Sequence, residues 1–317
     1  MSGYSSIPPD CGRRLLPVVI DEYARNEPDR AWASIPLDDW DLTQGYEDVS
    51  YDAFANAINK LAWFIERHVG RSSTFETIAY LGVPDIRYHM IQMAVCKTGH
   101  KVLFSSQLNS LYVHSLLMRQ TECVALFSAV GVHVDDILAD IPSLVHARVP
   151  DLDDLLNKDD RAPLYPYTKT FEEARFDPYL VMHTSGTTGE PKTVAVNHAV
   201  TASVDAIRKL PGAYGREQCL EFTALGDKVR FLIVTLPFHI MSAQYAMNLS
   251  IFGGGVFVPG FRHRSVDTKD IYGIIENARV QKAILTPWML EDIARHPNAK
   301  DYMERLEKVS FGGGKYL

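Results

Sequence analysis

Residues 183–192, which read HTSGTTGEPK, have the side-chain types that a phosphate-binding loop needs. Two glycines let the backbone turn so that successive N–H groups point inward, and the serine and threonine hydroxyls add further donors. Lys192 supplies a compact positive charge. The chain has 32 Lys and Arg against 39 Asp and Glu, so its net charge of −7 repels polyphosphates. The donors therefore have to be concentrated locally, and the sequence predicts a polyphosphate site in this loop.

Two other interpretations of the same loop remain open. A Walker A loop requires a second glycine where this chain has Pro191, when Gly186 is aligned with the first one. Proline has no N–H and a fixed φ, so a phosphate-binding amide would be lost there. The proline disfavours a P-loop NTPase. An ordinary Gly/Ser/Thr turn without a ligand is the other alternative.

The loop is embedded in an alternation of helical and strand patterns. Apolar residues at three- and four-residue spacing predict a helix over 52–69, with Ser50 and Gly70 as its caps. Further helices are expected over 85–99, 111–119, 197–210, 241–252 and 269–278. Strands are expected over 77–81, 101–105, 123–127, 179–183, 231–236, 255–258, 282–286 and 308–311. This alternation predicts an α/β fold with two doubly wound, mostly parallel sheet units.

Residues 148–178 interrupt the alternation, because aspartate and proline are frequent there and apolar periodicity is weak. We expect a surface connection in this segment. The chain then divides into a first α/β unit over 1–147 and a second over 179–317, which carries the phosphate loop.

Composition excludes several classes of protein. A net negative charge suits nucleic acid poorly as a partner. The four cysteines lie far apart, which argues against a disulfide framework and a zinc site. The longest apolar run, residues 229–238, is well short of the ~20 residues that span a bilayer. No signal peptide is recognised at the start. We expect a cytoplasmic protein with neither nucleic acid nor membrane as a partner.

The pattern T-S-G-T-T-G-x-P-K at residues 184–192 resembles the phosphate-loop motif of the adenylate-forming (AMP-binding) enzymes, which include acyl-CoA synthetases, luciferases and the adenylation domains of nonribosomal peptide synthetases (NRPS). Residues 49–51 and 97–101 are similar to early structural motifs of that superfamily. Residues 103–106, 169–174 and 236–239 look most like fungal NRPS-like enzymes, including carboxylic acid reductases and aminoadipate-reductase relatives. The similarity covers essentially the whole chain.

The resemblance implies a two-step activity. A carboxylic acid substrate attacks the α-phosphorus of ATP, giving an acyl-adenylate and pyrophosphate, and the phosphopantetheine thiol of a carrier domain then takes the acyl group. The enzyme mainly positions the reactants and stabilises charge. The residues that would hold the ATP phosphates with Mg²⁺ are Thr184, Ser185, Gly186, Thr187, Thr188, Gly189 and Lys192. Those that would line the acyl and adenine pocket are His239, Gly312, Gly313 and Gly314; a tight turn without a ligand is the alternative for the three glycines.

The residue after Phe238 bears on the substrate. Adenylation domains for α-amino acids carry an aspartate there, which pairs with the substrate ammonium, whereas this chain has His239. A buried ammonium without a partner is costly. By this resemblance the acid is an aryl, keto or other non-amino carboxylic acid.

Several family motifs have no counterpart after Gly314. They are the Tyr-Gly-x-Thr-Glu segment, the ribose-binding aspartate and the lysine of the C-terminal domain. We therefore expect an incomplete N-terminal adenylation domain over 1–317, truncated before its β-barrel part and C-terminal domain. No catalytic residue or metal ligand can be named, and we expect such a chain to be inactive alone. A non-catalytic remnant that acts through a partner chain is the alternative.

Overall fold

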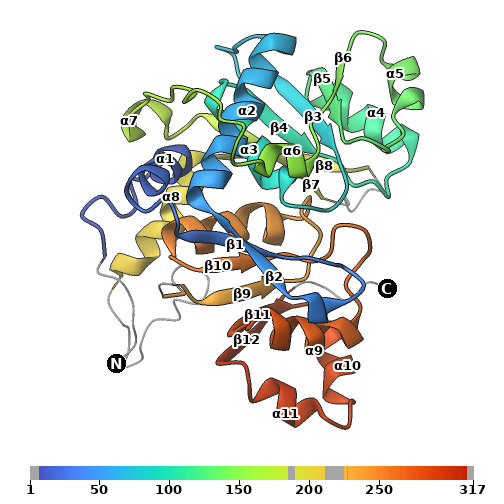
Figure 1. Ribbon diagram of the computed structural model, residues 1–317. Coiled ribbons are helices and arrows are strands. Elements are labelled where there is room, and N and C mark those ends of the chain that lie inside the picture. Colours follow the sequence, from blue (N-terminus) through green and yellow to red (C-terminus); the bar gives the residue numbers. More distant parts are fainter. Residues whose placement is uncertain (1–6, 185–189, 211–224, 227, 313–317) are drawn as a thin grey trace.

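The computed structural model describes residues 7–184, 190–210, 225–226 and 228–312 and shows two six-stranded sheets (Figure 1). Sheet A has the order β12 (Lys308–Phe311), β11 (Lys282–Leu285), β9 (Arg230–Ile233), β10 (Val256–Val258), β1 (Ala31–Pro36) and β2 (Tyr46–Ser50). Sheet B has the order β6 (Val145–Arg148), β5 (Cys123–Ser128), β3 (Thr77–Leu81), β4 (Lys101–Phe104), β7 (Pro178–Thr184) and β8 (Lys192–Asn197). Among the described strands, the pairs β1–β2 and β7–β8 are antiparallel and the other pairs are parallel, which confirms the predicted α/β fold with mostly parallel sheets.

Helices connect these strands and cover the sheets. The α-helices are α1 (Leu16–Asn26), α2 (Tyr51–Val69), α3 (Arg87–Lys97), α4 (Leu111–Gln120), α5 (Asp135–Asp140), α6 (Leu152–Leu156), α7 (Phe171–Ala174), α8 (His198–Ala206), α9 (Thr268–Asn277), α10 (Pro287–Ala294) and α11 (Ala299–Met303). The described residues also form two 3₁₀ turns, η1 (Leu42–Gln44) and η2 (Ile207–Lys209), and two π-helical turns, η3 (Met241–Tyr245) and η4 (Asn248–Phe252).

Local signals account for the best-defined of these elements. The Ser50 hydroxyl accepts the N–H of Ala53 at the start of α2, and Gly70 ends the helix at a φ of +86°, a value that glycine adopts without strain. All five residues of β3 are buried, as expected for a parallel strand that is covered on both faces. The predicted caps and the predicted strand 77–81 are both confirmed.

The two sheets divide the chain differently from the expected units 1–147 and 179–317. The strands β1 and β2 join sheet A, where Ala33 is the parallel partner of Phe257. The strands β7 and β8 complete sheet B beside β4. Figure 1 shows this crossing as the blue strands β1 and β2 lying beside the orange strands of sheet A. Pairing between distant segments, which leaves no local trace in a sequence, decides membership of a sheet.

The segment between the expected units packs closely against α2. It contains α6 and α7, and the side chain of Tyr165 is completely buried. The N–H of Tyr165 and that of Ala162 donate to the side-chain oxygens of Asn59 and Asn56 on α2. Residues 148–178 are thus an ordered cover of α2 in addition to a connection.

We call residues 241–252 the linking helix. It consists of η3, η4 and two α-helical residues, 246–247, between them. Its backbone confirms the predicted helix over 241–252, with wider π-helical turns at both ends. The Ser250 hydroxyl accepts a hydrogen bond from the indole N–H of Trp32 on β1, at 3.1 Å. The Ser242 carbonyl lies 3.1 Å from Nε2 of His89 on α3. The linking helix therefore contacts elements of both sheets through buried polar groups.

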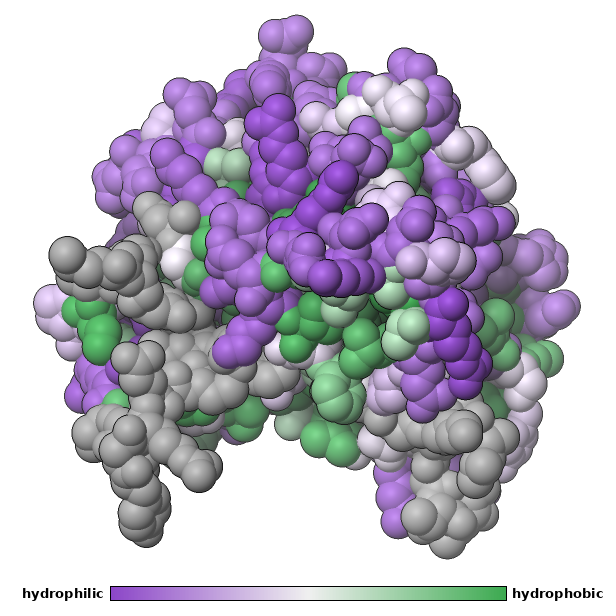
Figure 2. Space-filling view, turned by 90° about the horizontal axis from the view of Figure 1, so that it is seen from below, coloured by the Kyte–Doolittle hydropathy of each residue, from purple (hydrophilic) through white to green (hydrophobic). Residues whose placement is uncertain are grey.

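Polar residues cover most of the surface in Figure 2, and apolar residues are exposed in a recess at the lower edge of that view. None of the helices in the described ranges combines the length and the apolar character that a membrane span requires. The three described cysteines, Cys11, Cys96 and Cys123, are free thiols, and Cys219 lies outside the described residues.

A buried ion pair fixes the N-terminal segment to α8. The Asp205 carboxylate accepts hydrogen bonds from Arg14 Nε at 2.9 Å and from the Gly12 N–H at 2.6 Å. The Arg14 and Asp205 side chains are 6% and 0% exposed. We expect Asp205→Ala to lower the free energy of unfolding by about 3–5 kcal/mol, because it leaves the guanidinium buried without a counter-charge. Denaturant unfolding measures this change.

The matched control is Glu304→Ala, which removes an exposed partner of Lys300 on the surface. That pair should contribute less than about 0.5 kcal/mol. Equal losses in the two variants would contradict the importance of the buried pair.

Three buried histidines make stability depend on pH. Burial lowers the pKa of His89, His100 and His198 to about 4, below the value near 6.5 expected in the unfolded chain. Between these values the unfolded chain binds protons that the folded protein does not. The free energy of unfolding should therefore be highest above pH 6.5 and fall as the pH decreases toward 4.

Urea unfolding at pH 7.5, 6 and 5 measures this dependence. The variant His198→Gln should show a shallower decrease than the wild type, because it lacks one of the three buried imidazoles. A wild-type stability that is constant from pH 7 to pH 5 would be incompatible with neutral, buried histidines.

Candidate functional site

The predicted phosphate loop joins the two antiparallel strands β7 and β8. Thr184, the last residue of β7, is the cross-strand partner of Lys192, the first residue of β8. Both side chains are exposed. Of the predicted site residues, Ser185, Gly186, Thr187, Thr188 and Gly189 lie outside the described residues. A hydroxyl and an ammonium group therefore flank the predicted loop on neighbouring strands and are accessible to a ligand.

The hairpin lies at the carboxyl edge of sheet B. Because β4 runs parallel to β7, the residues that follow β4 reach the same edge. There the Ser105 hydroxyl lies 2.9 Å from Nδ1 of His114 and accepts a hydrogen bond from the Asn109 amide at 3.0 Å. The Tyr112 hydroxyl, on α4, donates to the Glu190 carboxylate in the hairpin at 3.1 Å. The start of α4 thus borders the hairpin.

Two histidines near this edge are held neutral. Burial lowers the pKa of His183, and burial together with the neighbouring His183 lowers the pKa of His114. Neutral imidazoles add no fixed positive charge, so Lys192 is the cation within the described part of the hairpin.

The Phe238–His239 segment follows β9 and leads into the linking helix. The Phe238 ring lies 6.2 Å from the ring of Tyr88, which itself packs against Tyr80 and Phe104 of sheet B at 4.7 and 4.9 Å. His239 is exposed, its Nδ1 accepts the N–H of Met241 at 3.2 Å, and its carbonyl accepts those of Ser242 and Ala243. Phe238 therefore packs against Tyr88 of α3, the helix beside sheet B, while the His239 ring remains accessible.

Gly312 follows β12 at the carboxyl edge of sheet A. The strands β9, β11 and β12 run parallel, so the residues after β9 and after β12 reach one edge of the sheet. A Cβ atom at Gly312 would meet none of the described residues within 4 Å. Gly313 and Gly314 lie outside the described residues. The described site residues thus form two groups, Thr184 and Lys192 on sheet B, and His239 and Gly312 on sheet A.

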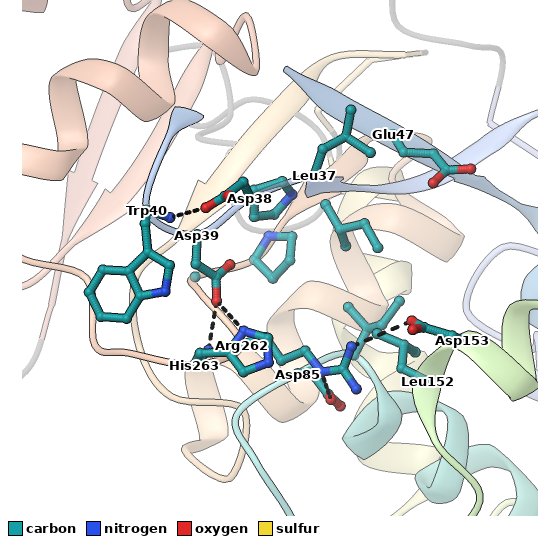
Figure 3. A pocket seen from close by; sticks show the side chains of 15 residues that line it. Leu37, Asp38, Asp39, Trp40, Glu47, Asp85, Leu152, Asp153, Arg262 and His263 are labelled. Atoms are coloured by element: carbon teal, nitrogen blue, oxygen red, sulfur yellow. Dashed lines mark hydrogen bonds and ion pairs between the residues drawn. The ribbon is translucent and has the colours of Figure 1, made fainter. Parts of the chain in front are cut away.

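A cavity of about 580 Å³ lies elsewhere, between the β1–β2 connection, the start of α3 and the segment after β10 (Figure 3). Its lining includes five carboxylates, those of Asp38, Asp39, Glu47, Asp85 and Asp153. Arg262 reaches toward Asp85 and Asp153, with each separation 3.5 Å, and His263 contacts Asp39 at 3.0 Å. None of the described site residues, Thr184, Lys192, His239 and Gly312, lines this cavity. The excess of carboxylates repels polyphosphate, so the cavity is unsuited to a nucleotide.

Among the described residues, no group of three or more His, Cys, Asp or Glu side chains is arranged to hold a metal ion. The donors at the hairpin are a hydroxyl and an ammonium group. Such a set fits phosphate oxygens, and a magnesium ion that is itself bound by the phosphates is compatible with it.

Comparisons with known proteins show the family of the chain. The model of the AMP-binding enzyme family matches residues 20–316. Carboxylic acid reductase from Neurospora crassa is 32% identical over 315 residues, which are 96% of this chain and 29% of that protein. The chain therefore spans less than a third of the length of this relative.

Solved structures share the fold. The inhibitor-bound N-terminal domain of FACL13 from Mycobacterium tuberculosis superposes with a TM-score of 0.74 at 14% identity, covering 94% of this chain and 70% of that one. O-succinylbenzoate coenzyme A synthetase from Bacillus subtilis, in complex with ATP and magnesium, gives a TM-score of 0.69 at 18% identity, covering 93% and 54%. The fold has two mostly parallel sheets and a hairpin that carries the phosphate-loop motif, and the family model matches most of the chain. The chain therefore belongs to the AMP-binding family of adenylate-forming enzymes.

Proposed function

We propose that this chain supplies the nucleotide and acid sites of an ATP-dependent carboxylic acid activation. An acid carboxylate oxygen attacks the α-phosphorus of ATP, the bond to the β-phosphate oxygen breaks, and an acyl-adenylate and pyrophosphate form. The thiol of a phosphopantetheine carrier then takes the acyl group and AMP leaves. The carrying observation is the cross-strand pair Thr184–Lys192, which flanks the motif at the carboxyl edge of sheet B in a chain of this family.

The hairpin is the proposed phosphate site. The Lys192 ammonium and the Thr184 hydroxyl would bind phosphate oxygens, together with the proposed donors Ser185, Gly186, Thr187, Thr188 and Gly189. Magnesium, when bound with ATP, would neutralise phosphate charge. The synthetase from Bacillus subtilis, whose structure holds ATP and magnesium, supports this choice of nucleotide and ion.

The acid is proposed to lie on the side of His239 and Gly312, with Gly313 and Gly314. The side chain of His239 has no carboxylate, and neither do those of its sequence neighbours Phe238 and Ile240. A substrate ammonium group would therefore have no counter-charge beside it. We therefore propose an aryl, keto or other non-amino acid. The name of the fungal relative, carboxylic acid reductase, supports an acid as the substrate class.

Replacement of Lys192 tests the phosphate site. A hydrogen bond to a charged group contributes about 1.5–3 kcal/mol, so Lys192→Ala should weaken MgATP binding by about 10- to 150-fold in calorimetric titration. Since the side chain is exposed, the melting temperature should not change. The matched control Lys300→Ala removes another exposed lysine and should bind MgATP like the wild type. Unchanged affinity in Lys192→Ala would place the phosphates elsewhere.

Calorimetric titration with a panel of acids tests the substrate class without requiring turnover. We expect at least one aryl or 2-oxo acid to bind more tightly than every α-amino acid. In His239→Asp the preference should shift toward α-amino acids, because the new carboxylate can pair with their ammonium group. A wild-type preference for an α-amino acid would refute the proposed class while leaving the activation chemistry in place.

A further inference from the structure

A closed ring of hydrogen bonds joins three elements that are far apart in the sequence. The hydroxyl of Tyr179 on β7 donates to Oε1 of Gln244 on η3 at 2.7 Å. The Gln244 amide nitrogen donates to Oγ1 of Thr201 on α8 at 2.9 Å, and Oγ1 lies 2.6 Å from the Tyr179 hydroxyl. The three residues are 1%, 5% and 1% exposed, in the order Tyr179, Gln244, Thr201.

The proton positions in this ring form a consistent cycle. Tyr179 uses its only proton toward Gln244, so its oxygen accepts the Thr201 proton. Thr201 has a second acceptor, the Asn197 carbonyl, but at 3.5 Å it is much farther away. The second amide proton of Gln244 is directed to Oδ1 of Asn248 at 3.2 Å. Each buried donor of the ring is thus satisfied, and the bonds polarise one another. Burial raises the pKa of Tyr179, which keeps the phenol protonated.

Each member of the ring belongs to an element that leads to the candidate site. Tyr179 lies on the strand that ends at Thr184, and Thr201 lies on the helix that follows β8. Gln244 lies in the first turn of the linking helix, five residues after His239. The ring is therefore a direct polar connection between the hairpin and the His239 segment.

The backbone at Gln244 supports a positioning role. Gln244 lies in a π-helical turn, a wider turn that is common at functional sites. Burying a polar amide has a cost that a leucine in the same place would avoid. The cost is offset here only because partners from both β7 and α8 are in place. The amide thus fixes the first turn of the linking helix relative to β7 and α8.

We propose that Gln244 is a positioning residue that couples the β7–β8 hairpin to the His239 segment, so that nucleotide bound at the hairpin orders the acid side and acid orders the nucleotide side. The ligand part of this inference rests on the proposed function. Coupling between two binding sites is reciprocal, so either ligand can reveal it.

Hydrogen–deuterium exchange tests the coupling in the ligand-free protein. Gln244→Leu and Thr201→Val each remove the ring and keep the approximate side-chain volume. Loss of one buried hydrogen bond corresponds to about fivefold more frequent local opening. We expect faster exchange in both variants at residues 178–184 and at residues 238–248. Thr201→Ser retains the hydroxyl and should exchange like the wild type.

Ser250→Ala is the matched control. It removes a buried hydrogen bond from the other end of the same helix, toward Trp32 in sheet A. Its effect should stay within residues 31–36 and 246–252. If Gln244→Leu and Thr201→Val accelerate exchange only in their own elements, or if Ser250→Ala reaches residues 178–184 equally, the coupling is refuted.

Addition of MgATP separates this inference from the proposed function. In the wild type, MgATP should slow exchange at residues 238–248, and in Gln244→Leu that protection should be lost. Persisting protection in the variant overturns the coupling. A wild type that does not bind MgATP overturns the proposed nucleotide site, and the ligand-free comparison then decides the coupling by itself.

Discussion

The linking helix packs against elements of both sheets, so its buried polar side chains need hydrogen-bond partners on those elements. At one end Gln244 bonds to Tyr179 and Thr201 around sheet B, and at the other end Ser250 bonds to Trp32 on β1 of sheet A. Unpaired, each of these buried groups would cost about 1–3 kcal/mol. These hydrogen bonds fix the position of the two sheets relative to each other. They also fix the position of His239, which lies just before the helix.

Much of the fold could be predicted because buried parallel strands appear in the sequence as continuous apolar runs. The continuous apolar run 77–81 is β3, and the capped helix over 52–69 is α2 to within one residue. The strand β2 escaped prediction because most residues of Tyr46–Ser50 are exposed or half-buried and carry no continuous apolar run. In β1 the apolar run is short and interrupted by the buried Ser34. β8 escaped for a similar reason, since most of its residues face solvent. Membership of a sheet depends on pairing between distant segments, which periodicity does not encode.

The candidate site shows the same division between local and distant information. The phosphate-loop motif is local, and the pairing of Thr184 with Lys192 follows once two strands flank it. Gln244 could not be found in this way, because Tyr179, Thr201 and Gln244 meet only in the folded chain. The one available sign was a polar glutamine within an otherwise largely apolar helical segment, 241–252. The acidity of the cavity in Figure 3 likewise arises from segments that are far apart in the sequence.

The central claim is that the hairpin on sheet B and the His239 segment on sheet A serve one acyl-adenylate between them. Titration with a stable aryl acyl-adenylate analogue, compared with AMP and with the free acid, tests this claim most directly. A ligand that spans two positioned subsites loses its translational freedom only once. The analogue should therefore bind at least about 100-fold more tightly than AMP or the free acid. MgATP should displace it. An analogue that binds no more tightly than AMP would contradict a shared site.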